Sequence, residues 1–270
     1  MKLRLVKGEH YTYVITQEST IQKNPKEKAI LTQTMNLKIR HDVIDKLING
    51  NYLIEASILN FNMELKYNGT VSRYDSDTVN VMNKYYKSLD FLTQIKLSYE
   101  VSPVGVVSKL SGFEPINKKI KTDHQLSSLL RSFGNEQFLM ELYNYVPVKS
   151  VGVGNKWTST GILPDMMNLK YDIHYTFKQA SAQSLKLNQE ASLNFSTEAP
   201  VASGKTGLLK ESGTQKGILL IDPKNSMRLS SNLDQQIEII MVDQNKPKGE
   251  KTSPIKITTN TKMLLVKNKR

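Results

Sequence analysis

The sequence predicts a mainly β (α+β) protein, in which one large curved antiparallel sheet or half-barrel of about a dozen strands carries two or three inserted helices. Three observations favour this class. Apolar and polar residues alternate through most of the chain, turn-forming residues separate the alternating segments, and only two stretches show helical spacing. The chain has 270 residues, of which 39% are hydrophobic and 23% are charged, and these values are typical of a globular protein.

The clearest alternating segment spans residues 31–43, where Met35, Leu37 and Ile39 share one face and polar residues occupy the other. This pattern indicates a half-buried antiparallel strand. The same pattern predicts strands at 11–21, 52–61, 63–74, 95–101, 169–177, 185–195, 217–221, 237–242 and 255–266. The predicted turns between strands are Asn49-Gly50, Asn68-Gly69, Ser102-Pro103-Val104-Gly105 and Asp222-Pro223-Lys224-Asn225. Short connections of this kind predict a meander, and no βαβ rhythm is present.

Helical spacing occurs in two stretches. In residues 78–92 the apolar positions recur every three or four residues, and Asp77 or Thr78 is placed to cap the helix. In residues 113–146, Pro115 suits a first helical turn and Asp123 suits a second cap. We therefore expect two or three helices within an otherwise antiparallel β protein.

The domain organisation has two interpretations. Residues 1–270 form a single domain, or two related β-meander halves, 1–112 and 157–270, are joined by a helical segment at 113–146. The second interpretation rests on short echoes: residues 35–38 recur at 167–170, and residues 55–61 resemble 190–195. Alternating strands share composition, so chance remains an alternative explanation of these echoes.

Two glycine-containing motifs resemble nucleotide-binding loops. Residues 203–206 read Ser-Gly-Lys-Thr, but Ala199 stands where a phosphate-binding loop needs glycine and no helix pattern follows. We expect a polar hairpin loop there. Residues 152–154 read Gly-Val-Gly without a third glycine, and we expect a turn that leads to Trp157.

Candidate catalytic residues are sparse. The four histidines are not spaced as metal pairs, and the absence of cysteine removes thiolate ligands, so we expect no metal and no cofactor. His41 and His174 could share a face, although ordinary strand histidines fit the pattern better. The carboxylate pairs Glu9 with Glu18 and Asp42 with Asp45 lack an apolar surround. We expect no enzyme and no catalytic residues, and a hydrolase on a similar sheet is a minor alternative.

The charge balance is strongly basic, with 37 Lys and Arg against 25 Asp and Glu, giving a net charge of +12. The positive residues are scattered over polar strand faces without interleaved aromatic residues, so we expect no nucleic-acid partner, whereas an anionic envelope surface fits. No transmembrane segment is expected, because no stretch of 18 apolar residues occurs. Residues 1–7 do not resemble a secretory signal, so the chain is expected to be cytoplasmic or already processed, with any lipid-anchoring cysteine upstream.

Aromatic and long apolar residues fall on both the predicted strands and the predicted helices. One interpretation is an ordinary core between the sheet and the helices. The other is that a wide sheet curls around the helices and leaves a cavity for a lipid or other hydrophobic ligand. The candidate cavity-lining residues are Tyr11, Tyr13, Phe61, Tyr67, Val79, Met82, Tyr86, Leu89, Tyr99, Tyr175 and Phe177.

Several short segments resemble the uncharacterised β-rich secreted and lipoprotein family of Bacteroidota. They are residues 3–5, 7–13, 32–35, 102–105, 111–113, 146–148 and 153–157. The resemblance implies an origin as a signal-bearing or lipoprotein precursor and a location in the periplasm or at the outer membrane. Asn155 departs from the acidic residue that is common in this family, and no catalytic residue carries over. In fold pattern, the chain is also similar to periplasmic lipoprotein-carrier half-barrels.

Together these expectations describe a non-enzymatic cell-envelope protein that binds a lipid or other hydrophobic ligand between sheet and helices. The alternative is an accessory structural subunit of an outer-membrane protein complex, with sheet edges and basic faces available to an outer-membrane protein partner.

Overall fold

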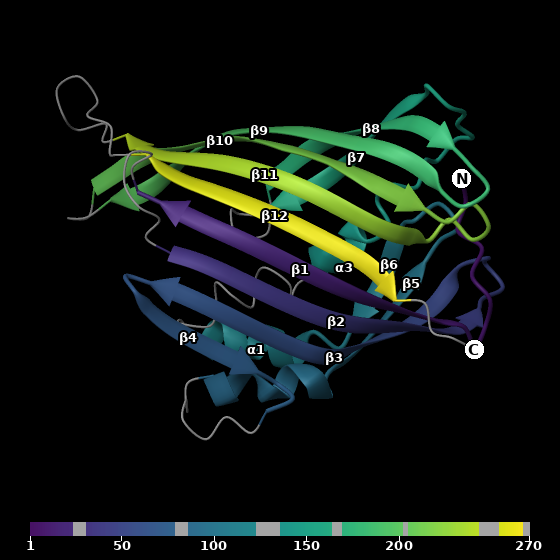
Figure 1. The fold of residues 1–270 in the computed structure, drawn as a ribbon, viewed down its shortest axis with the longest axis horizontal. Helices are drawn as coiled ribbons and strands as arrows, with labels where there is room; N and C mark the ends of the chain where they lie inside the picture. Colours follow the sequence, from purple (N-terminus) through teal and green to yellow (C-terminus); the bar gives the residue numbers. More distant parts are fainter. Residues whose placement is uncertain are drawn as a thin grey trace.

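A single twelve-stranded antiparallel sheet dominates the structure, a computed structural model (Figure 1). It describes residues 1–23, 31–78, 86–122, 136–163, 169–201, 205–242 and 254–266. The strands are β1 (His10–Gln22), β2 (Leu31–Lys46), β3 (Tyr52–Tyr67), β4 (Thr70–Asp75), β5 (Lys96–Val101), β6 (Val107–Ser111), β7 (Lys156–Leu163), β8 (Leu169–Ala180), β9 (Leu185–Val201), β10 (Lys205–Ile221), β11 (Arg228–Val242) and β12 (Ile255–Val266). The described helices are the 3₁₀ helix η1 (Tyr86–Gln94) and the α-helices α1 (Glu114–Thr122) and α3 (Glu136–Glu141).

The strand order shows how the sheet is wound: β6-β5-β3-β2-β1-β12-β11-β10-β9-β8-β7, with β4 paired to β3 alone. The first and last strands pair in the middle, where Thr12 lies opposite Val266. The edges of the sheet are β6 and β7, which do not pair with each other. The sheet is therefore an open half-barrel, and the predicted fold class is confirmed.

A β-bulge explains one predicted strand boundary that is wrong. In β3, Asn60 pairs with Lys38 and Ile58 with Ile39, so Leu59 is an extra residue. The bulge places Ile58 and Phe61 on the same buried face, which breaks the period of two without ending the strand. The predicted break at residue 62 is thus wrong, and β3 continues to the predicted turn at Asn68-Gly69, where both φ angles are positive.

Other strand boundaries differ more simply. The strands β10 and β11 are much longer than the predicted segments 217–221 and 237–242, because their polar portions do not alternate with apolar residues. The short edge strands β6 and β7 were not predicted as strands. The strand β12 has the predicted bounds.

The helices α1 and α3 lie behind the curved sheet in Figure 1. Part of the predicted helix 78–92 appears as η1, and residues 79–85 lie outside the described part. The predicted segment 113–146 contains α1, with Pro115 in its first turn, and α3; Asp123 lies outside the described residues. None of the described helices combines the length and the apolar character that a membrane span needs.

The N-terminal segment connects two turns that belong to opposite halves of the sheet. The backbone N–H of Leu3 donates to the carbonyl oxygen of Pro103 at 2.8 Å, and that of Arg4 donates to the carbonyl oxygen of Asn225 at 3.0 Å. Leu3 and Leu5 are buried in the core cluster. The segment therefore ties the β5–β6 turn to the β10–β11 turn at one end of the half-barrel.

The two predicted halves share one sheet through the β1–β12 pair. The echoed residues fall on β2 and the start of β8, and on β3 and β9, although residues 167–168 lie outside the described part. A duplication stays a prediction.

Candidate ligand-binding site

The predicted cavity-lining residues mostly fill the core. Seven of them are buried in one continuous cluster: Tyr11, Tyr13, Phe61, Leu89, Tyr99, Tyr175 and Phe177. Tyr67 is exposed at 55% of its surface, near the β3–β4 turn. Val79 and Met82 lie outside the described residues, as does the side chain of Tyr86. Among the members of this set whose side chains the structure describes, Phe61 lines the cavity on the concave face, and the other seven do not.

A buried chain of polar side chains crosses the core. His41 Nδ1 and Tyr99 Oη are 2.7 Å apart, and Tyr99 Oη and Tyr143 Oη are 2.9 Å apart. Burial lowers the pKa of His41 to about 4, with a smaller opposing effect from Asp42. The imidazole is therefore neutral at pH 7. His174 is exposed and lies 3.1 Å from Thr158 Oγ1, so the suggestion that it shares a face with His41 is wrong.

The inner cavity lies between the sheet and α3 and has a volume of about 140 Å³. Strands β1, β2, β3, β11 and β12 contribute its walls. Its lining residues are Ile15, Gln17, Met35, Leu37, Phe61, Glu141, Leu142, Arg228, Ser231, Leu233, Thr261 and Met263. Most of the lining residues are apolar, and the polar ones come from β1 (Gln17), α3 (Glu141), β11 (Arg228 and Ser231) and β12 (Thr261).

Arg228 points into the half-barrel because of another bulge. Ile221 pairs with Arg228 while Leu220 pairs with Ser230, so Leu229 is the extra residue. Nη2 of Arg228 donates to the carbonyl oxygen of Glu141 at 2.8 Å, and the guanidinium lies 4.9 Å from the centre of the Tyr145 ring. Among the described residues, the hydrogen-bond acceptor of Nη1 is Met263 Sδ, which lies 4.0 Å away. The buried Nε has no hydrogen-bond partner among the described residues, although Arg228 is only 5% exposed.

Two further polar groups line the inner cavity beside Arg228. Ser231, which follows the bulge on β11, is 6% exposed, and its Oγ also has no partner. Glu141 also lines the inner cavity, and its side chain is exposed to solvent. The protein atoms around it raise the pKa of its carboxyl group to about 7, and the nearby charge of Arg228 acts to lower this pKa. An exposed side chain at this depth indicates interior space that the described side chains do not fill.

Sequence reasoning missed these three residues. Strict alternation along β11 would place Arg228 on the outer face, and only the unpaired Leu229 reverses this. Glu141 did carry a signal, because Leu139, Leu142 and Tyr143 surround it with apolar residues in the sequence.

The concave face continues beyond the inner cavity as a half-buried apolar surface. Leu233, which also lines the inner cavity, packs against the core without being fully covered, as do Leu65, Phe195 and Ile237. They come from β3, β9 and β11, so they lie on both sides of the β1–β12 seam. Apolar area of this kind next to a cavity is typical of a binding surface for hydrophobic molecules.

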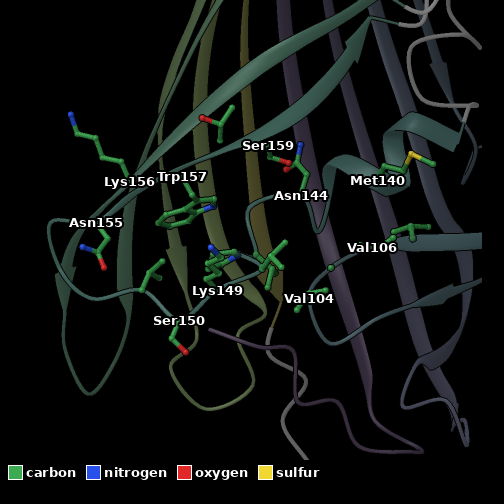
Figure 2. A pocket seen from close by; sticks show the side chains of 17 residues that line it. Val104, Val106, Met140, Asn144, Lys149, Ser150, Asn155, Lys156, Trp157 and Ser159 are labelled. Carbon is green, nitrogen blue, oxygen red and sulfur yellow. The ribbon is translucent and has the colours of Figure 1, made fainter.

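A second pocket lies between the two sheet edges and has a volume of about 720 Å³ (Figure 2). Trp157 of β7 lines one side and the β5–β6 turn, with Val104 and Val106, lines the other. Trp157 stacks on Tyr175 with ring centres 5.6 Å apart, and its buried Nε1 has no partner. Val106 and Val148 are 58% and 76% exposed. This edge pocket therefore has exposed apolar side chains, and its lining also includes polar and charged residues such as Asn144, Lys149 and Lys156.

The glycine motifs and carboxylates serve structural roles. Lys205 and Thr206 lie on β10, where they pair with Val201 and Pro200 of β9, whereas residues 203 and 204 of the predicted hairpin loop lie outside the described part. Residues 153–154 form the predicted turn before β7. Asp42 is paired with Arg40, and Asp45 with Lys7. Within the described ranges, no three or more His, Asp or Glu residues come together as a metal site.

The fold and the inner cavity define this chain as an open half-barrel with a partly polar, mainly apolar interior. Residues 49–228 match a family of unknown function, DUF6263. The match covers more than half of the chain and runs from before β3 to Arg228, so the chain belongs to this family. A search of the curated proteins finds no match.

Proposed function

We propose that this protein is a non-enzymatic cell-envelope protein that holds a lipid or other hydrophobic ligand against the concave face of its half-barrel. The observation that carries this proposal is the inner cavity, together with the half-buried apolar side chains beside it. Glu141, the last residue of α3, supports this proposal, because its side chain lines the inner cavity and is still exposed to solvent.

The charge and the resemblance support the envelope as the compartment. A net charge of +12 favours association with anionic surfaces, which membranes with acidic lipids provide. Among the described residues that line the inner cavity, no hydrogen bond links two side chains that could act as acid and base, and this favours binding over chemistry.

The direct test is extraction of natively purified protein with organic solvent, followed by mass spectrometry of the extract. We expect a stoichiometric lipid or other hydrophobic compound. A protein that is empty after mild purification, and that also fails to take up the uncharged fluorescent probe N-phenyl-1-naphthylamine, would overturn the proposal.

The edge pocket favours a second candidate, an accessory structural subunit of an outer-membrane complex. The unpaired edges β6 and β7 offer backbone groups to an added strand, and exposed Val148 offers an apolar contact. Under this candidate, Val148→Asp abolishes co-purification of an envelope partner, whereas Val71→Asp on β4 does not. Val71 is a matched control because it is also exposed, at 44%.

A further inference from the structure

The buried guanidinium of Arg228 has no carboxylate partner. Its contacts are the Glu141 carbonyl oxygen, Met263 Sδ and the Tyr145 ring, and no carboxylate oxygen of the described residues forms an ion pair with it. Removing a cation from water is costly unless an anion or several acceptors replace the hydration. One hydrogen bond and a ring face compensate only part of this cost.

The groups of Arg228 that lack partners lie beside another buried donor. Arg228 Nε–H and Ser231 Oγ both belong to side chains that line the inner cavity and are more than nine-tenths buried. Arginine binds carboxylates through paired N–H groups, and a hydroxyl can donate a further hydrogen bond. The inner cavity therefore offers a positive charge and converging donors to an anionic group.

The size of the cavity limits what it can hold. A water molecule occupies roughly 30 Å³ in the liquid. A volume of about 140 Å³ thus accommodates a head group with a few methylenes, and not a whole lipid. The remainder of a chain would lie on the half-buried apolar surface that Leu233 and Ile237 form further along β11.

We propose that the ligand of the concave face is an acyl chain ending in a carboxylate, and that Arg228 and Ser231 bind this carboxylate in the inner cavity. This inference rests on the proposed function and adds the chemical class of the ligand. Glu141 lines the same cavity. In its protonated form it can donate to the bound carboxylate, and in its ionised form it repels it.

The test compares dodecanoic acid with its methyl ester, each measured by displacement of N-phenyl-1-naphthylamine from the full chain at pH 6.5. We expect the acid to bind about 10-fold or more tightly than the ester, as the loss of a charge-assisted hydrogen bond implies. In Arg228→Gln, the acid and the ester should bind within about twofold of each other, because the acid loses its charged partner. Ser231→Ala should weaken acid binding severalfold.

The pH profile provides a readout that does not need an Arg228 variant. Acid binding by the wild-type protein should weaken above pH 7, whereas Glu141→Gln should bind equally at pH 6.5 and 8.5. The other groups that act on Glu141 are Arg228, Tyr171 and Tyr175, and both tyrosines have pKa values raised by burial, so they stay neutral in this range.

The outcomes separate the two proposals. Equal affinity for acid and ester in the wild-type protein would overturn the carboxylate site and leave hydrophobic binding intact. Binding of neither compound would overturn both. If Arg228→Gln does not fold, as judged by circular dichroism, unchanged acid binding in Ser231→Ala together with a flat wild-type pH profile would overturn the carboxylate site.

Discussion

The guanidinium of Arg228 donates from Nη2 to the main-chain carbonyl oxygen of Glu141 at 2.8 Å. This hydrogen bond joins the start of β11 to the last residue of α3 across the concave face. The carbonyl group of the last residue of a helix receives no hydrogen bond from within the helix, and Arg228 supplies one to Glu141. It also holds Arg228 in the cavity while its Nε–H remains without an acceptor.

The buried chain from His41 through Tyr99 to Tyr143 should contribute to stability. Tyr99→Phe removes the central hydroxyl and leaves two buried polar atoms without this partner. We expect a loss of about 2 kcal/mol in the free energy of unfolding, measured by urea denaturation. Tyr67→Phe is the matched control and should change stability by less than about 0.5 kcal/mol, because Tyr67 is 55% exposed. Equal effects of the two substitutions would contradict the stabilising role.

Acid should destabilise the protein through His41. Its pKa is about 4 in the folded chain, against the ordinary histidine value of 6.5, so between these values only the unfolded chain takes up the proton. The free energy of unfolding should therefore fall as the pH falls from about 6.5 to 4, by about 3 kcal/mol from this residue.

Glu141 acts in the opposite direction over part of this pH range, because its raised pKa makes the folded state lose stability as the pH rises from 4.5 through about 7. The informative quantity is the difference between wild type and His41→Gln, in which Glu141 contributes equally. Unfolding curves from pH 4 to 7.5 should show a smaller acid loss in His41→Gln. Identical pH dependence in the two proteins would rule out the buried neutral imidazole.

The turn before α1 should tolerate no side chain at Gly112. Its φ is +90°, and an added Cβ would overlap the carbonyl oxygen of Lys96. We expect Gly112→Ala to cost about 3 kcal/mol or more in urea unfolding, since both backbone strain and overlap contribute. Gly50→Ala shares the strain, with φ +83°, but meets no atom within 4 Å, so about 1 kcal/mol is expected. A Gly112→Ala protein as stable as Gly50→Ala would show that β5 can move away.

The sequence was sufficient for the fold class, because the period of two survives in most strands and apolar residues such as Leu37 and Ile39 point inward as predicted. It was insufficient where one unpaired residue reverses the pattern. Leu59 led to a wrong break in β3, and Leu229 concealed the inward position of Arg228. The edges β6 and β7 were missed because a short strand paired on one side carries little alternation.

The predicted site residues show the same limit. Aromatic residues such as Tyr13 and Tyr99 lie inside, but composition alone cannot distinguish a side chain that fills a core from one that lines a cavity. The polar groups of the inner cavity come from β1, α3, β11 and β12, which are far apart in sequence, so the tertiary fold is needed to bring them together.

The central claim is that the concave face holds a hydrophobic ligand. The most direct test measures the affinity for N-phenyl-1-naphthylamine before and after a substitution that fills the inner cavity. Leu233→Trp adds bulk to the wall of the inner cavity, whereas Leu264→Trp adds the same bulk on the neighbouring strand at a residue that is 58% exposed. We predict saturable probe binding by wild type and Leu264→Trp, and at least about a 10-fold weaker affinity for Leu233→Trp. Equal affinity in all three proteins would place the probe elsewhere and contradict the account.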